Sequence, residues 1–592
     1  MTKSSLIENF LKLRYKYISQ KNLVFILAIL IGLLSGLVSV TIKNITFGIE
    51  WLLQNGIIEH YKGIYFILPV IGIWLVYVFV KYVSKKPVEH AIPSILFSLS
   101  KKDGLLDKNK IYLPLITAPI TVGFGGSVGL LGPAIASASA VSSQLGQLLK
   151  IDRKTRTLLI GCASAGAISS IFQSPIAAII FALEVFSLDL TFASLLPLLI
   201  ASVSSVLTSY FFVGNGLLFN FVVTDEFELS DTIFFIILGI GTGIGSIYFS
   251  KIYFTILKIF DRFKTSGQKL IVGGLAIGAM LFFIPPLYGE GFGFINDLLD
   301  GNHLHALGKT PFDDYLDNIW VVVALLIGIT IFKAVAMTTT FAAGGTGGII
   351  IPTMVMGSTL GNVVGKIINN LGLNFNVSEA NFTLIGMAGL IAGVLHAPLT
   401  AIFLIAEITG GYQLFVPLMI TVSMSFIITK SSIDHTIYTK ELAEKGALLT
   451  HNKDMSVLIL MKLEDVIERD FTVLNPEMTL GEMLHNGVSK SSRNLFPVVD
   501  TKKHLVGIIL LDDIRTVMFD QSLYETTSVE TFMHNPPDYI YYESDSMKQV
   551  MKKFQDTGAW NLPVVKNGLY YGFVSKSKLL TAYRKELINF TA

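Results

Sequence analysis

One passage of this chain occurs twice, and each copy combines glycines, apolar residues and a proline. The first copy, Gly125–Pro133, reads GGSVGLLGP, and the second, Gly344–Pro352, reads GGTGGIIIP in the same nine-residue frame 219 positions later. Glycine- and proline-interrupted apolar segments at corresponding positions of two halves are typical of broken helices that meet at a transporter's substrate site. Glycines let backbone N–H groups approach a ligand, and a helix start adds partial positive charge. The repeat therefore predicts an anion site built from two helix starts.

The two halves also match further along the chain. The tetrapeptide Phe172–Pro175 is followed by Glu184 nine residues after its proline, and Leu395–Pro398 is followed by Glu407 at the same distance. A carboxylate at membrane depth is costly and is normally a functional candidate. Each of these glutamates, however, ends an apolar helix, where a buried salt bridge or a helix cap is the use we favour.

The composition indicates a membrane protein. Of the 592 residues, 52% are hydrophobic and 15% are charged, whereas soluble domains carry about 25% charged residues. Several apolar runs approach or exceed the roughly 20 residues that span a bilayer. These runs are Leu23–Thr41, Ile64–Tyr82, Phe192–Val213, Ile233–Leu257, Leu270–Leu287 and Ile319–Thr338. We expect an all-α polytopic membrane protein with an inverted internal repeat and broken helices.

The charges near the amino terminus predict the orientation. The first 22 residues contain Lys3, Lys12, Arg14, Lys16 and Lys21, and such clusters face the cytoplasm by the positive-inside rule. The same rule places the basic cluster at 150–156 there. We read no cleaved signal peptide, and the single cysteine, Cys162, excludes an internal disulfide. The expected location is the cell membrane, with the amino terminus and the carboxy-terminal part in the cytoplasm.

The last 140 or so residues contain a second repeat. Phe496–Asp500 (FPVVD) recurs 66 residues later as Leu562–Lys566 (LPVVK), and each copy precedes a strand-like run with glycine and then a helix-like stretch. Short strands alternating with helices at this period indicate two copies of one small α+β unit. The pattern resembles a tandem pair of CBS domains, which implies a cytoplasmic regulatory module.

These observations define the expected domains. Residues 1–22 form a cytoplasmic segment, and residues 23–440 form the membrane domain with repeat halves at about 23–213 and 232–430. A linker at 441–460 leads to the CBS pair at 461–592, with copies at about 461–520 and 525–592.

The repeated passages together with the CBS pair resemble the CLC family of chloride channels and proton/chloride exchangers. The resemblance implies a homodimer with one pore inside each subunit, in a lipid bilayer, and chloride bound where helix starts converge. The family motifs align with Glu89–Pro93, Gly129–Pro133 and Gly348–Pro352, and His90 stands where the family has a serine. The implied anion-binding residues are His90, Ala91, Ile92, Gly129, Leu130, Leu131, Gly348, Ile349, Ile350 and Tyr438.

Two positions depart from the family in ways that affect mechanism. Leu131 stands at the position of the gating glutamate, and Val185 stands at the position of the inner glutamate that delivers protons. Neither side chain can ionise, so the sequence predicts passive anion conduction rather than proton-coupled exchange. The family also has a tyrosine at the central anion site, and direct counting aligns its position with Asp434. Because a carboxylate would repel the anion, we favour Tyr438, which lies one helical turn later.

His90 suggests a role for pH. An imidazole donates hydrogen bonds and gains charge near neutral pH, so protonation of His90 beside the central site should strengthen anion occupancy. The alternative is a histidine that caps backbone or faces water.

The CBS pair raises the question of an adenine nucleotide. In the family, the residues that contact ribose are a glycine followed six residues later by an aspartate. Gly507 and Asp513 of the first copy keep this spacing, whereas Gly572 of the second copy leads to Lys578. The hydroxyl residue that the family usually has nearby is kept only in the second copy, as Ser575. Each half-site is thus degraded, and a dimerisation and stability module is the reading we favour over nucleotide binding at Asp513 and Ser575.

Other function classes receive less support. The alternatives are a proton-coupled chloride exchanger that uses other carboxylates, and a membrane-anchored nucleotide-sensing CBS protein. No enzyme, nucleic-acid partner or cofactor is expected, because the chain lacks a nucleophile–base pair and a phosphate-binding lysine motif. No metal site is expected either. The only candidate ligands, His303, His305, Asp313 and Asp314, are better explained by a solvated loop.

Overall fold

The computed structural model divides the chain into two compact units. It describes residues 16–55, 62–187, 191–214, 219, 227–308, 310–372, 376–445, 447 and 453–591. The first unit is Met1–Lys445 and the second is Gly446–Ala592. The division falls where the apolar runs end and the polar carboxy-terminal part begins.

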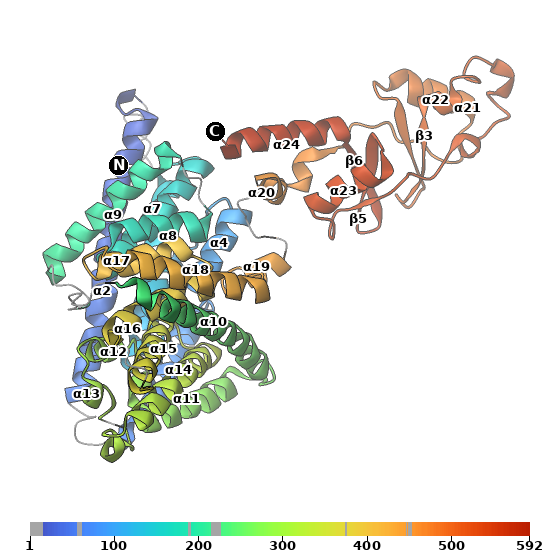
Figure 1. The fold of residues 1–592 in the computed structure, drawn as a ribbon. Helices are drawn as coiled ribbons and strands as arrows, with labels where there is room; N and C mark the ends of the chain where they lie inside the picture. The colour runs from blue at the N-terminus through green and yellow to red at the C-terminus, as the bar shows by residue number, and fades with distance from the viewer. Residues whose placement is uncertain are drawn as a thin grey trace. The chain divides into compact units, whose positions relative to one another are not determined.

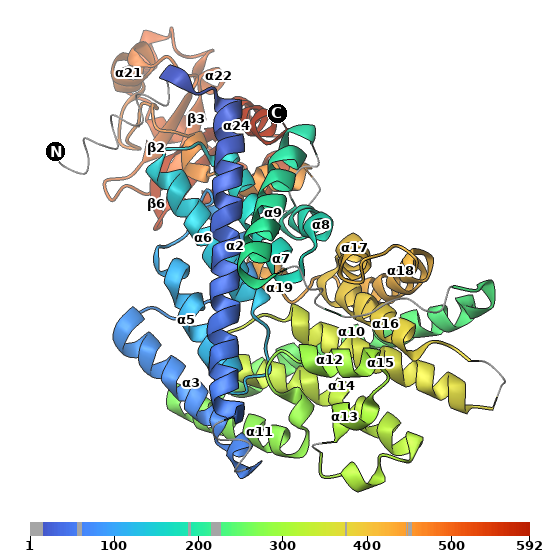
Figure 2. The same ribbon diagram turned by 90° about the vertical axis from the view of Figure 1, so that its left-hand side faces the viewer.

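The described part of the first unit is helical (Figure 1). Seven of its described helices are long and apolar enough to cross a membrane. The helix α2 (Gln20–Leu53) runs along much of the unit (Figure 2). The other helices are α3 (Leu68–Phe79), α4 (Ala91–Lys101), α5 (Asn109–Gly123), α6 (Leu131–Leu148), α7 (Arg153–Phe172), α8 (Pro175–Phe186), α9 (Phe192–Val213), α10 (Thr232–Phe260), α11 (Ser266–Phe283), α12 (Phe292–Leu299), α13 (His303–Leu307), α14 (Ile319–Ala342), α15 (Ile350–Asn370), α16 (Glu379–Leu395), α17 (Pro398–Ile408), α18 (Phe415–Ser432) and α19 (Lys440–Glu444).

Proline and glycine set the breaks between these helices. The residues that directly follow α7 and α16, Gln173 and His396, adopt the left-handed conformation with φ of 56° and 53°. Pro175 and Pro398 then begin α8 and α17, because a proline at the first helical position loses no hydrogen bond. The two matching tetrapeptides are therefore the same helix–break–helix junction in each half.

Hydrogen bonds between equivalent residues relate the two halves by a local two-fold. The amide of Gly129 donates to Gly348 O at 2.9 Å, and the amide of Gly348 donates to Gly129 O at 2.6 Å. The amide of Thr346 donates to the Thr121 hydroxyl at 3.1 Å. In return, the amide of Ser127 donates to the hydroxyl of Thr340 at 3.3 Å. Such reciprocal pairing of equivalent groups is the mark of a two-fold relation, and it brings the two glycine-rich passages together.

The spans differ from the hydropathy-based expectation in two ways. The run Ile64–Tyr82 is not one span but a short 3-10 turn, the helix α3 and a π-turn. The break falls just before α3, which carries Pro69 in its first turn, because a proline is tolerated in the first turn of a helix but not in its interior. The helices α7 and α18 are apolar enough to span a membrane, although neither was among the predicted runs. In α7, many buried positions are serine, alanine or glycine, which lowers the apolar signal.

The second unit contains two α+β copies. The strand β2 (Leu495–Val499) pairs antiparallel with β3 (Leu505–Leu510), and β5 (Asn561–Lys566) pairs antiparallel with β6 (Leu569–Ser575). Both hairpins carry a bulge at the same place in the repeat, between Val498 and Val499 and between Val564 and Val565. The strands β1 (Ile467–Glu468) and β4 (Ile540–Tyr541) complete a sheet in the order β1-β6-β5-β4. The helices are α20 (Lys453–Leu460), α21 (Leu480–Glu482), α22 (Leu511–Ile514), α23 (Met547–Thr557) and α24 (Lys576–Thr591).

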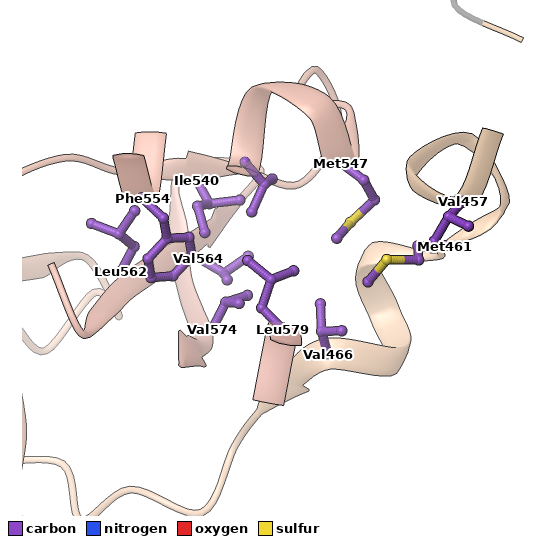
Figure 3. Close-up of a cluster of buried hydrophobic side chains, with 11 residues drawn as sticks. Val457, Met461, Val466, Ile540, Met547, Phe554, Leu562, Val564, Val574 and Leu579 are labelled. Atoms are coloured by element: carbon purple, nitrogen blue, oxygen red, sulfur yellow. The ribbon is translucent and has the colours of Figure 1, made fainter. Parts of the chain in front are cut away.

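A hydrophobic core joins the second copy to the segment before the first (Figure 3). Phe554, Leu562 and Val564 are almost completely buried, and Val457 of α20 belongs to the same cluster. Residues 441–460, which we expected to be a linker, therefore end in a helix that packs into this core. The helix-like stretch expected after the first strand pair forms only the short helix α22, which ends at Ile514.

Candidate anion site

A small cavity lies where the helix starts of the two halves meet. Its volume is about 20 Å³, which is enough for roughly one water-sized occupant. We call it the central cavity. It is lined by His90, Ala91, Ile92, Pro93, Gly132, Tyr253, Phe341, Gly347, Gly348, Ile349, Ile437 and Tyr438. Six of the ten residues implied by the family resemblance thus lie around one space.

Three chain segments approach each other at this cavity. A methyl group placed on Gly132 would lie 3.2 Å from the Cα atom of Gly348 and 3.6 Å from the Ala91 side chain. The start of α6, the start of α4 and the second glycine-rich passage therefore converge on one point. The first amides of a helix have no partner within it, so α4 and α6 offer hydrogen-bond donors and partial positive charge there.

The other four predicted residues are placed differently. Leu130, Leu131 and Ile350 are buried, and none of these three residues lines the central cavity. Gly129 does not line it either, and its amide donates to Gly348 O. The amides of Gly129 and Gly348 each donate to the carbonyl oxygen of the other residue. These two amides therefore join the two halves and do not serve as hydrogen-bond donors to an anion.

His90 and Tyr438 both reach the central cavity. His90 precedes α4, its side chain makes no capping hydrogen bond, and its ring packs edge-on against Phe341 with 5.4 Å between centroids. Tyr438 is 6% exposed, whereas Asp434, the alternative from direct counting, is exposed to the surroundings. Tyr253 and Phe341 were missed, since aromatic residues within apolar helices give no signal of a site.

A larger cavity adjoins the central one. Its volume is about 300 Å³, and it shares His90, Ala91, Phe341 and Gly347 with the central cavity. We call it the vestibule. Glu89 and Lys269 also line it. The vestibule thus borders both residues of the central cavity and the charged residues Glu89 and Lys269.

Glu184 and Glu407 cap helices in the opposite half. The carboxylate of Glu184 accepts hydrogen bonds from the amides of Leu399 and Thr400 at the start of α17, at 3.1 and 2.8 Å. The carboxylate of Glu407 accepts from the amides of Ile176 and Ala177 at the start of α8, at 3.1 and 2.8 Å. The helices α8 and α17 lie side by side in both views (Figures 1 and 2). The two glutamates have the structural role of caps, exchanged between the halves, and Val185 follows one of them.

A third glutamate lies at the start of α6, where sequence reasoning had placed no carboxylate. Glu290 accepts a hydrogen bond from the Leu130 amide at 2.8 Å. It belongs to the Tyr288–Gly291 segment, a polar loop that precedes α12. An isolated glutamate in a polar loop carries no sequence signal of such a contact.

The speculative nucleotide residues use their side chains within the second unit. Asp513 accepts from the Leu510 amide at 2.7 Å and lies 3.0 Å from His534 Nε2. Ser575 donates to Glu468, which also pairs with Arg493. Although burial raises the pKa of Glu468, these hydrogen bonds and the arginine charge hold that pKa below its usual value.

The polar loop shows no metal-binding arrangement. Within the described residues, no three His, Cys, Asp or Glu side chains are grouped to hold a metal ion. His305 instead lies 2.9 Å from Asp297.

Comparison with known proteins gives consistent matches. The model of the voltage gated chloride channel family matches residues 72–430, and the CBS domain model matches residues 463–520 and 529–585. The chain is 24% identical to the voltage-gated ClC-type chloride channel ClcB of Citrobacter koseri, over 71% of this chain and 99% of that protein. It is 26% identical to the H(+)/Cl(-) exchange transporter ClcA of Vibrio campbellii, over 54% of this chain and 66% of that protein.

A solved structure supports the fold over nearly the whole chain. The crystal structure of a eukaryotic CLC transporter matches with a TM-score of 0.61 at 17% identity, covering 95% of this chain and 99% of that one. Paired helix starts around a cavity, in a multi-pass helical unit, define a membrane protein that transports anions. The chain belongs to the voltage gated chloride channel (CLC) family, with two CBS domains at its carboxy-terminal end.

Proposed function

We propose that this protein is a passive chloride channel of the cell membrane, with its amino terminus and CBS domains in the cytoplasm. The observation that carries the proposal is the central cavity, where residues from the starts of α4 and α6, together with His90 and Tyr438, surround a space for one small ion. Chloride is the anion in the names of both relatives described above. We also propose that the protein is a homodimer, which is what its resemblance to the family implies.

Passive conduction follows from the side chains at two positions. Leu131 and Val185 replace the two glutamates that the family's exchangers use, and neither can bind a proton. Without these groups, an anion passing the central cavity has no obligatory proton partner at either position.

A flux experiment in liposomes tests this proposal. The purified protein is reconstituted with an outward chloride gradient, and chloride efflux and internal pH are recorded together. Passive conduction predicts chloride efflux only when valinomycin and potassium dissipate the voltage, with no coupled proton uptake. Proton uptake against its gradient, at a fixed ratio to chloride, would contradict it.

Proton-coupled chloride exchange is the second candidate, because two observations favour it. Glu290 brings a carboxylate to the start of α6, and one relative is named an exchange transporter. In that case the same liposomes show proton uptake driven by chloride, and Glu290→Gln abolishes the uptake.

For the CBS pair we propose a dimerisation and stability role. The internal hydrogen bonds of Asp513 and Ser575 support this role, because both side chains already have partners. Calorimetry of the full-length protein with ATP and AMP should show no binding, and binding in the micromolar range would restore the nucleotide hypothesis.

A further inference from the structure

The start of α6 already has an anion bound to it, and that anion is part of the protein. The Glu290 carboxylate accepts the Leu130 amide at 2.8 Å. Leu130 immediately precedes α6, and no side chain of its own segment caps this helix. A helix start attracts a carboxylate for the same reason that it attracts a halide, namely its free amides and partial positive charge.

The second half of the repeat shows what this amide does when no glutamate is present. Ile349 is the equivalent of Leu130, and it immediately precedes α15. Ile349 lines the central cavity, and among the described residues no protein acceptor is found for its amide. One of two equivalent amides is therefore available to a ligand, while a carboxylate from a distant loop occupies the other. If Glu290 served only to cap a helix start, the equivalent start of α15 should need a cap as well.

The segment that presents Glu290 is held firmly in place. Leu287 O accepts from Ser127 Oγ at 2.6 Å and from Lys333 Nζ at 3.2 Å. Gly289 O accepts from the same Lys333 ammonium at 3.0 Å, and Tyr288 Oη donates to Gly123 O at 2.5 Å. These bonds fasten the three residues before Glu290 and leave its side chain free to rotate about its own bonds.

Charges of both signs surround the carboxylate. Lys333 of α14 and Lys43 of α2 lie close enough to attract it, while Glu50 of α2 repels it. The Lys333 ammonium donates to two carbonyl oxygens of the segment and is completely buried. Glu290 itself is partly exposed.

We propose that Glu290 is a tethered carboxylate gate, which competes with the transported anion for the start of α6. It would supply, from another segment, the carboxylate that Leu131 cannot provide. The carboxylate occupies the amide when ionised. When it takes a proton from solvent, it becomes a neutral acid, releases the amide and admits an anion. This inference rests on the proposed anion transport, and it holds for either a channel or an exchanger.

Two variants and a control test the gate. In Glu290→Gln the side chain is neutral at every pH, and in Glu290→Asp it is one methylene shorter. Glu50→Gln removes a neighbouring carboxylate that is not bound to α6. All are made in a His90→Ala background as well, so that histidine titration does not contribute. Chloride flux is measured from pH 4.5 to 8, and chloride binding is measured by calorimetry.

The gate predicts a specific pattern. Flux through the unmodified protein should rise as pH falls, by up to about tenfold for each pH unit, because only the protonated form is open. In the His90→Ala background, flux through Glu290→Gln should be high and independent of pH, and Glu50→Gln should keep the pH dependence. Glu290→Gln should also bind more chloride at pH 8 than the unmodified protein does.

The two readouts separate this inference from the proposed function. If no variant conducts chloride, the transport proposal fails, and the binding comparison still decides whether Glu290 competes with an anion. Equal chloride binding by Glu290→Gln and the unmodified protein at pH 8, or a pH dependence of flux that survives in Glu290→Gln combined with His90→Ala, overturns the gate. If Glu290→Gln does not fold, Glu290→Asp must show the raised binding, and its absence overturns the gate.

Discussion

The contact between the two glycine-rich passages allows a quantitative test with a matched pair of substitutions. A methyl group at Gly348 would lie 2.8 Å from Gly132 N and 3.3 Å from Gly129 O, so it meets backbone. At the equivalent Gly129, the closest atoms belong to the side chain of Ile351, at 3.0 Å. Overpacking of this kind costs about 1–3 kcal/mol. We expect Gly348→Ala near 3 kcal/mol and Gly129→Ala near 1 kcal/mol on that scale.

The methyl group added in Gly348→Ala should also weaken chloride binding. Gly132 lines the central cavity, and the methyl group at residue 348 would push its amide away. If the strain is relieved by that movement, 1–3 kcal/mol corresponds to an affinity loss of roughly 5–150-fold. Chloride calorimetry and melting in detergent measure both effects. Gly293→Ala is the control, because a methyl group there meets nothing within 4 Å. Normal binding and melting of Gly348→Ala, or an equal loss in Gly129→Ala, would refute the reasoning.

Three further predictions concern other parts of the chain. Glu184→Ala should lower the free energy of unfolding more than Glu407→Ala, each by about 2 kcal/mol or less, because Glu184 also accepts the Thr400 hydroxyl; melting in detergent measures both, and the reverse order would contradict this. In a Glu290→Gln background, chloride affinity should still rise from pH 8 to pH 5 as His90 gains charge. Adding His90→Ala should abolish this rise. If the rise persists in that double variant, His90 has no part in anion binding. Phe554→Ala should cost about 3–5 kcal/mol and remove hydrogen-exchange protection from β5 and β6; retained protection would show that the core tolerates the cavity.

Local patterns were enough to predict the positions of the helix starts. The glycine-rich passages lead into α6 at Leu131 and into α15 at Ile350, and the tetrapeptides before Pro175 and Pro398 mark the breaks. Glycine and proline act on their own backbone, so their effect is visible in a few residues. The doubled PVV motif identified the two hairpins of the second unit for the same reason.

Contacts between distant segments could not be predicted in this way. The Glu290–Leu130 bond joins residues 160 positions apart, and the caps at Glu184 and Glu407 span 215 to 231 positions. A carboxylate can accept any exposed amide, so its identity says nothing about its partner. The hydropathy of Ile64–Tyr82 also predicted one continuous span, which is wrong. An average over a window of residues does not register that the single Pro69 separates the short turn before it from α3.

The exchanged caps of α8 and α17 have a consequence for biosynthesis. Glu407 leaves the ribosome more than 200 residues after α8, which at 5–20 residues per second is a delay of roughly 10–50 s. During that interval the amides of Ile176 and Ala177 lack their final acceptor. The amino-terminal half must therefore persist as an unfinished intermediate until the later half arrives, and separately synthesised halves would each need the other to mature.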